Sequence, residues 1–125
     1  MIPDDLLYSK EHEWLRVEGD IGIIGITDYA QNQLGDIVYV ELPAVGAKVE
    51  ATRPFGTIEA VKAVSDLNSP ISGEVIEVNE EVGSDPTVIK SSPYGQGWMI
   101  KVRVADNGEL NSLIKPDEYR KLVGE

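Results

Sequence analysis

Apolar and polar positions alternate or cluster in short segments that glycine and proline separate. The clearest segments span five to seven residues and are rich in valine and isoleucine: 13–17, 21–26, 36–41, 74–78 and 98–104. Such lengths and spacings are typical of antiparallel strands joined by tight turns. The pattern therefore predicts a mainly β fold.

Helical signals flank this β pattern. Thr27 can cap a short helix from residue 28 to about 34, which Gly35 would end. Near the C-terminus, Leu110, Leu113 and Ile114 have helical spacing. Pro116 suits a first helical position, and the apolar stripe at 119, 122 and 123 ends at glycine 124. We expect one domain over 1–125, with a helical C-terminal segment from about 106.

A short internal repeat suggests two related halves. Residues 35–40 (GDIVYV) reappear as residues 73–78 (GEVIEV), and a Val-Gly pair follows each copy. Chance similarity between strands is one explanation. The other is a pair of β halves packed face to face about a pseudo-twofold axis, with the connecting segment crossing between them.

Lys62 lies near the middle of that connecting segment. An apolar, β-rich arm precedes it over 55–61 and another follows over 64–67, so Lys62 would stand at a hairpin tip. It is the only basic residue between Arg53 and Lys90, and small residues surround it. A lysine amine on a flexible stem is suited to forming an amide with an activated acid. By itself, one lysine in a hairpin is also compatible with an ordinary surface residue.

Composition removes several kinds of chemistry. The chain has no cysteine, which excludes disulfides, thiolate metal sites and cysteine nucleophiles. Its one histidine, His12, excludes multi-histidine metal sites and weakens any serine–histidine mechanism. We expect a structural role for His12, packing roles for Trp14 and Trp98, and a loop at 95–97. We expect no metal and no enzymatic activity, so reactive atoms would have to arrive on an attached group.

The net charge of −11 disfavours nucleic acid and anionic membranes as partners. The run 73–85 carries five acids and no base; it is either a solvated face or a docking face for basic partners. The acidic start of the chain lacks the features of a secretion signal or transit peptide. We expect a cytoplasmic protein, with a mature mitochondrial chain as the alternative.

Ordered motifs along nearly the whole chain resemble the H-protein family of the glycine cleavage system. The matching segments, in chain order, are residues 12–14 (HEW), 24–31 (IGITDYAQ), 34–43 (LGDIVYVELP), 59–63 (EAVKA), 69–75 (SPISGEV), 78–80 (VNE), 92–95 (SPYG) and 97–98 (GW). Two positions depart from the family pattern, because Ala60 replaces a common serine and Lys90 a common asparagine. Neither departure removes Lys62.

The resemblance implies a lipoyl-type flattened β-barrel sandwich that carries lipoate on Lys62. In the family, the lipoyl disulfide accepts an aminomethyl group from a pyridoxal-phosphate glycine decarboxylase. An aminomethyltransferase then passes the carbon to tetrahydrofolate, and dihydrolipoyl dehydrogenase restores the disulfide. The family also implies a lipoate-attaching enzyme as a partner, and a relay of lipoyl groups to other carriers is compatible with it.

The family stabilises the carried amine with carboxylates, and the matching positions here are Glu13 and Asp66. Glu59 is the candidate for recognition by the modifying enzyme. Other carriers fit less well, since biotinyl domains place methionines where Val61 and Ala63 stand. Lipoyl domains of 2-oxo acid dehydrogenases place aspartate before the lysine. An unmodified acidic interaction module and a small hydrolase or transferase are the remaining alternatives.

Overall fold

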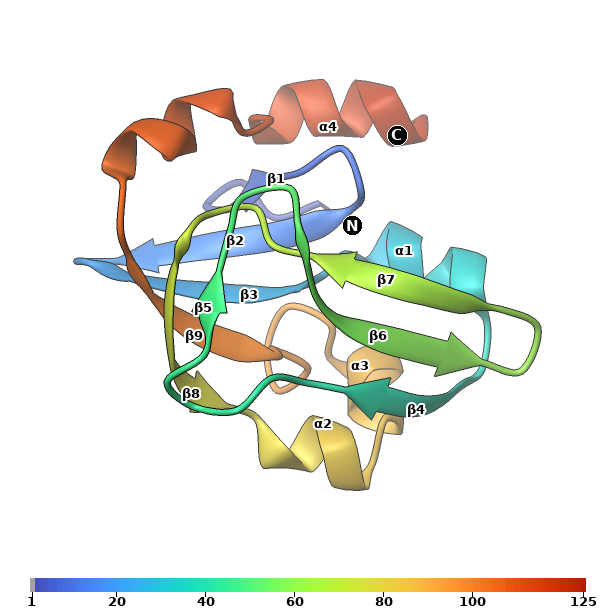
Figure 1. Ribbon diagram of the computed structural model, residues 1–125. Coiled ribbons are helices and arrows are strands. Elements are labelled where there is room, and N and C mark those ends of the chain that lie inside the picture. The colour runs from blue at the N-terminus through green and yellow to red at the C-terminus, as the bar shows by residue number, and fades with distance from the viewer. Residues whose placement is uncertain (1) are drawn as a thin grey trace.

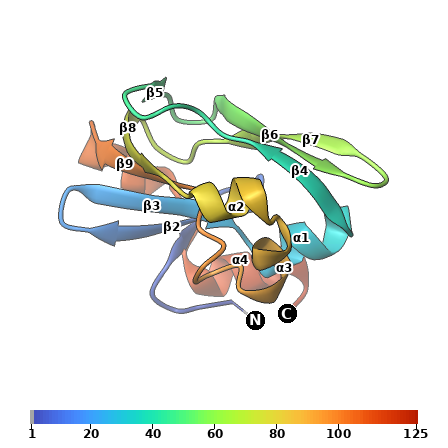
Figure 2. The same cartoon turned by 90° about the horizontal axis from the view of Figure 1, so that it is seen from below.

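Two antiparallel sheets form the centre of the protein in the computed structural model, which describes residues 2–125 (Figure 1). The six-stranded sheet has the order β1 (Leu7–Tyr8), β2 (Glu13–Glu18), β3 (Ile21–Ile26), β9 (Ile100–Val104), β8 (Gly73–Val78) and β5 (Lys48–Val49). The three-stranded sheet has the order β4 (Ile37–Glu41), β6 (Pro54–Ala60) and β7 (Val64–Asn68). No strand of one sheet pairs with the other among these residues. The expected flattened sandwich is confirmed, and it is not a closed barrel (Figure 2).

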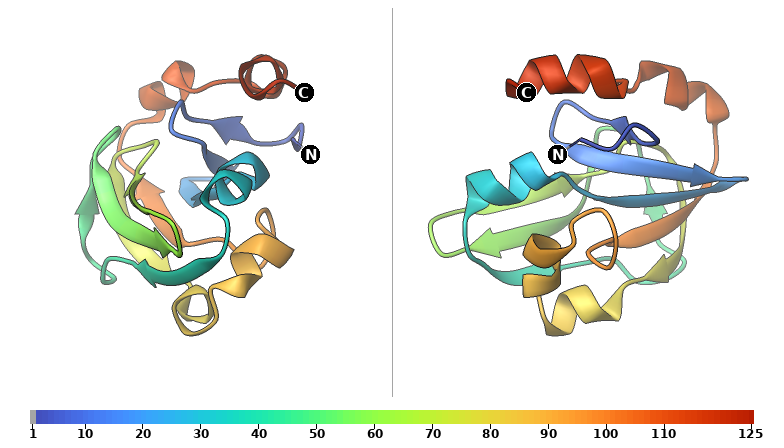
Figure 3. Two further views of the ribbon diagram at one scale, coloured as in Figure 1. Left: turned by 90° about the vertical axis from the view of Figure 1, so that its right-hand side faces the viewer. Right: turned by 180° about the vertical axis from the view of Figure 1, so that it is seen from behind.

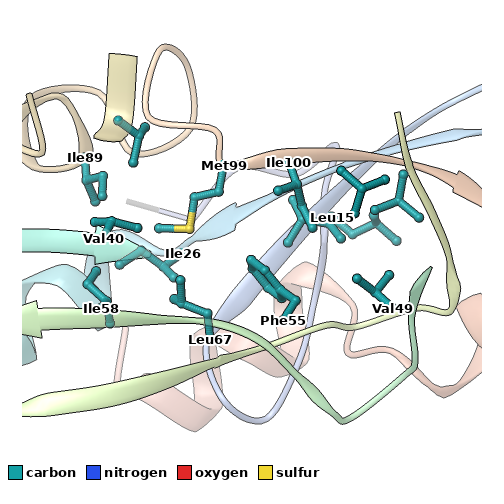
Figure 4. Packing of buried hydrophobic residues seen from close by; sticks show 14 of the residues in the cluster. Leu15, Ile26, Val40, Val49, Phe55, Ile58, Leu67, Ile89, Met99 and Ile100 are labelled. Atoms are coloured by element: carbon teal, nitrogen blue, oxygen red, sulfur yellow. The ribbon is translucent and has the colours of Figure 1, made fainter. Parts of the chain in front are cut away.

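Apolar side chains from the two sheets meet in one core. Ile58 and Leu67 come from the small sheet, whereas Leu15 and Ile100 come from the large one, and all four are at most 1% exposed. Figure 4 shows Met99 and Phe55 between these layers. Burial alternates along much of β8 and β9, as in strands with one buried face, whereas β3 is buried continuously over residues 22–26.

The sequence repeat folds as two related strands on opposite sheets. β4 holds the first copy and pairs with β6, while β8 holds the second and pairs with β9. In each ladder the register shifts at the fourth residue of the repeat, at Val38 in β4 and at Ile76 in β8. Two bulges at one repeat position are hard to attribute to chance similarity of sequence, because a bulge bends and twists its strand in a specific place.

The first helix has the predicted bounds. α1 (Asp28–Leu34) starts where Thr27 Oγ1 accepts a hydrogen bond from the backbone N–H of Ala30, at 3.2 Å. It ends at Gly35, which has a φ of +81° and donates its N–H to the Gln31 carbonyl. Only glycine adopts that backbone conformation without strain.

The predicted C-terminal helices are also present. η1 (Asn107–Ser112) is a 3₁₀ helix, and α4 (Pro116–Val123) ends at Gly124, whose φ is +84°. Ile114 lies outside both helices, contrary to its helical spacing. It exchanges two backbone hydrogen bonds with Tyr8, of 2.9 and 2.7 Å. The extended backbone of Lys115, which precedes a proline, favours this arrangement.

Several short elements were not predicted. They are β1, β5, α2 (Glu80–Ser84) and α3 (Thr87–Ser91), each too short to display a full period. The strand expected over 98–104 begins only at Ile100. The carbonyl of Trp98 accepts from the Asn79 side-chain amide at 2.7 Å, so it is bound by a side chain and not by a neighbouring strand.

α4 is joined to the sheet and to α1 through Tyr119. Its ring stacks on Tyr8 with centroids 4.5 Å apart, and the residue is fully buried. Its hydroxyl lies 2.8 Å from His12 Nδ1 and 2.7 Å from Thr27 Oγ1. The helix at the end of the chain thus holds His12, which directly precedes β2, and Figure 1 shows α4 lying beside β1.

We expect Tyr119→Phe to lower the free energy of unfolding by about 1–2 kcal/mol, because it removes the hydroxyl that the buried Thr27 and the partly buried His12 share. Urea denaturation measures this loss. Tyr39→Phe is the matched control, since it makes the same substitution at a residue that is 52% exposed. If both variants are as stable as the parent protein, the Tyr119 hydroxyl makes no net contribution to the free energy of unfolding.

Candidate functional site

Lys62 stands at the tip of the β6–β7 hairpin, as the sequence predicts. The backbone N–H of Ala60 donates to the carbonyl of Ala63 at 2.8 Å and closes the turn. The N–H of Val61 donates to the carbonyl of Asp36 at 2.9 Å, which fastens the turn to the start of β4. The hairpin projects from one end of the molecule, and Lys62 is exposed there (Figures 1 and 3).

Both departures from the family pattern flank this turn. Ala60 is 5% exposed and opposes Ile37 across the ladder, so its methyl group faces the interior. Lys90, on α3, lies 3.8 Å from the Asp36 carboxylate. Neither residue covers the exposed lysine.

Glu59 is exposed on the outer face of the small sheet. In the register it lies between Tyr39 on β4 and Val64 on β7. Tyr39, Val64 and Val61 are all more than half exposed. The lysine is therefore surrounded by apolar surface with one carboxylate, a combination that a modifying enzyme could recognise.

A cleft of about 160 Å³ lies between α1, the β6–β7 hairpin and the residues around the start of β2. Glu13 and Asp66 both border it, so the structure brings together the two carboxylates that the sequence singled out. Apolar side chains of four elements, β3, α1, β6 and β7, form much of the remaining wall: Ile26, Ala30, Leu34, Ile58 and Leu67. Since one water accounts for about 30 Å³ of liquid, this cleft has room for the end of a side chain or short ligand.

Glu13 is a buried carboxylate, only 2% exposed. Burial raises the pKa of its carboxyl from the ordinary value to about 7, although the hydrogen bonds that it accepts from Ser9 Oγ and the N–H of Asn68 work in the opposite direction. These bonds measure 2.5 and 3.3 Å. Near neutral pH the group can therefore hold or release a proton in response to a charge placed in the cleft.

Asp66 is exposed at the rim of the cleft, so its carboxylate and that of Glu13 differ sharply in environment.

His12 also borders the cleft, with a φ of +72° and a hydrogen bond to Tyr119. Burial lowers the pKa of its imidazole. The structure gives His12 the packing role that was expected. Trp14 is fully buried with its indole N–H bound to the Pro93 carbonyl.

A larger cavity of about 400 Å³ lies on the other side of Glu13. Ser9, Thr52 and Asn68 border it, and Glu13 and Glu11 line both cavities. The sequence pointed to the smaller cleft through Glu13 and Asp66 but not to the larger cavity, whose walls come from segments far apart in the chain.

Two further properties concern residues 2–125. None of the helices there is both long and apolar enough to cross a membrane. No three side chains of the kinds that bind metal ions come together in that part of the chain.

Comparison with known proteins gives consistent matches over the full chain. The family model described as Glycine cleavage H-protein matches residues 6–125. A glycine cleavage system H protein of Carboxydothermus hydrogenoformans is 55% identical over 125 residues, which cover 100% of this chain and 96% of that protein. The protein of the same name from Staphylococcus carnosus is 49% identical over 124 residues, 99% of this chain and 98% of that protein.

A solved structure agrees with the fold. The crystal structure of a glycine cleavage system H protein from Mycobacterium marinum superposes with a TM-score of 0.92 at 40% sequence identity, and it covers 99% of this chain and 100% of that one. Sequence and structure lead to one conclusion: the chain belongs to the glycine cleavage H-protein family.

Proposed function

We propose that the chain carries lipoate as an amide on Nζ of Lys62 and shuttles the aminomethyl group of glycine between the enzymes of glycine cleavage. Members of the family are lipoyl carriers in glycine cleavage and not catalytic enzymes. The observation that carries the assignment to Lys62 is its exposed position on a projecting hairpin, next to a cleft with carboxylates. When bound, the lipoyl group supplies the disulfide that accepts the aminomethyl group.

The residues around the cleft fit an arm that ends in an amine. The apolar wall suits an alkyl chain, and Glu13 and Asp66 offer carboxylates to an ammonium, a strong charge-assisted contact. A cleft shields a labile group from water between visits to partner enzymes. Attachment to the protein keeps that group at a high effective concentration near each enzyme.

The proposed partners follow from this role. They are the pyridoxal-phosphate glycine decarboxylase, the tetrahydrofolate-dependent aminomethyltransferase, dihydrolipoyl dehydrogenase and a lipoate-attaching enzyme. Glu59, exposed on the same hairpin as Lys62, is proposed as a contact for the attaching enzyme. A relay of lipoyl groups to other carriers would use the same lysine and is part of the proposal.

The test is mass spectrometry of the intact protein and its peptides after incubation with a lipoate-attaching enzyme, lipoate and ATP. One addition is expected, and it should map to the peptide that contains Lys62. Parallel incubation with a biotin ligase and biotin should give none. Addition of biotin in place of lipoate, or of neither under conditions that modify a known carrier, would refute the proposal.

A further inference from the structure

Gly35 lies directly beneath the side chain of Lys62. A Cβ on Gly35 would stand 2.9 Å from Cε of Lys62 and 3.6 Å from its Nζ. The first distance is shorter than carbon atoms in contact adopt, near 3.5–4.0 Å. The end of the exposed, flexible lysine side chain therefore lies in the space that a side chain at position 35 would fill, and a Cβ there would displace it.

This contact places the stem at the end of α1 that borders the cleft. Gly35 follows Leu34, and Leu34, Gln33 and Ala30 of the same helix line the cleft. The opposite wall includes Ser65 and Asp66, three and four residues after Lys62. A side chain that passes over Gly35 is thus directed between these walls.

In the unmodified protein, the positive charge of Lys62 also favours a position of its side chain at the end of α1. The last turn of α1 contains no basic residue. A helix C-terminus carries partial negative charge from its free carbonyl groups, so a nearby ammonium is favourable. Amide formation removes that charge but leaves the steric opening at Gly35.

We propose that Gly35 is a positioning residue for the arm on Lys62. By lacking a side chain, it gives the lysine stem a path across the end of α1 and directs the group attached to Nζ into the cleft beside Leu34 and Asp66. This inference rests on the proposed function, because the attached group is the proposed lipoate.

Backbone strain has to be separated from the contact with the lysine. Gly35 has a φ of +81°, which is unfavourable for any L-residue with a side chain. Gly124 is the control for a positive φ, since it ends α4 with a φ of +84° and a Cβ there would have no neighbour within 4 Å. Its ψ is 26°, whereas that of Gly35 is −141°, so Gly124→Ala reproduces the positive φ of a helix end but not the whole strain at Gly35. The Overhauser effect in the lipoylated parent, which involves no substitution, is therefore the second measurement.

The experiment is NMR spectroscopy of labelled parent protein, Gly35→Ala and Gly124→Ala, before and after lipoyl attachment. The unmodified parent should show a nuclear Overhauser effect between the Gly35 α-protons and the Lys62 ε-protons. On attachment, amide signals of Leu34, Ser65 and Asp66 should shift in the parent and in Gly124→Ala. In Gly35→Ala these shifts should fall to less than half.

Equal shifts in Gly35→Ala and the parent would overturn the inference. If Gly35→Ala does not fold, the test relies on the lipoylated parent protein. An Overhauser effect between the Gly35 α-protons and the Lys62 ε-protons of that protein supports the inference, and its absence overturns it. Mass spectrometry of the same samples separates this result from the proposed function. If no lipoyl group is added at Lys62 of the parent, the proposed function is refuted. If the group is added but Gly35→Ala shows the same chemical-shift changes as the parent, only the role of Gly35 is refuted.

Discussion

Lys62→Arg is expected to abolish glycine cleavage in a system reconstituted from the four proteins, with a loss of at least about 10²-fold, the order of gain that tethering provides. Arginine keeps the positive charge and the long stem of lysine. Its guanidinium is permanently protonated and does not accept an activated acid to form the amide. The variant therefore removes the attachment point and little else.

The fold of Lys62→Arg should be intact. Lys62 is exposed, and exposed substitutions away from special backbone positions usually change stability by less than about 0.5 kcal/mol. Lys90→Arg is the matched control, because Lys90 is also exposed and pairs with Asp36 beside the same turn. It should retain lipoyl attachment and cleavage. Undiminished cleavage by Lys62→Arg would show that another residue carries the cofactor.

Glu13→Gln is expected to stabilise the protein by about 2–3 kcal/mol at pH 8 and to change its stability little at pH 4. The pKa of Glu13 is raised to about 7 in the folded protein, whereas it is near its ordinary value in the unfolded chain. Between those values the folded state binds more protons than the unfolded state. The free energy of unfolding contributed by this group therefore falls as pH rises from about 4 to about 7, then stays low.

Glutamine should remove this slope without losing the local contacts. Its carbonyl can accept from the Asn68 N–H, and its amide can donate to Ser9 Oγ, which is itself able to accept. Urea denaturation from pH 4 to 8.5 gives the difference between the two proteins, in which all other titrating groups cancel. Asp66→Asn is the control, since Asp66 is exposed and its replacement should leave stability almost unchanged. A flat difference curve for Glu13→Gln would contradict the raised pKa.

The raised pKa of Glu13 also affects the proposed carrier role. An ammonium that enters the cleft favours the ionised form of Glu13, so entry would be coupled to release of a proton near neutral pH. Glutamine offers no charge to the amine. We therefore expect lipoylated Glu13→Gln to lose a carried aminomethyl group faster than the parent, most clearly above pH 7.

The sequence by itself determined the local features of this protein. The Thr27 cap and Gly35 defined both ends of α1, because caps act through backbone groups a few residues away. Alternation of apolar residues located the long strands, and the repeat at 35–40 and 73–78 corresponds to two strands with bulges at equivalent positions. The β-rich arms around a single exposed lysine likewise located the Lys62 hairpin.

Tertiary structure alone decided the properties that depend on distant segments. The pKa of Glu13 follows from its burial. The smaller cleft beside it has walls from α1, β6, β7 and the loop before β2, and the larger cavity has walls from that loop, the turn at 51–52 and η1. The contact of Lys62 with Gly35 joins residues that are 27 positions apart in the chain. Desolvation and steric fit depend on which atoms surround a group in space, whereas sequence patterns report only on neighbours along the chain.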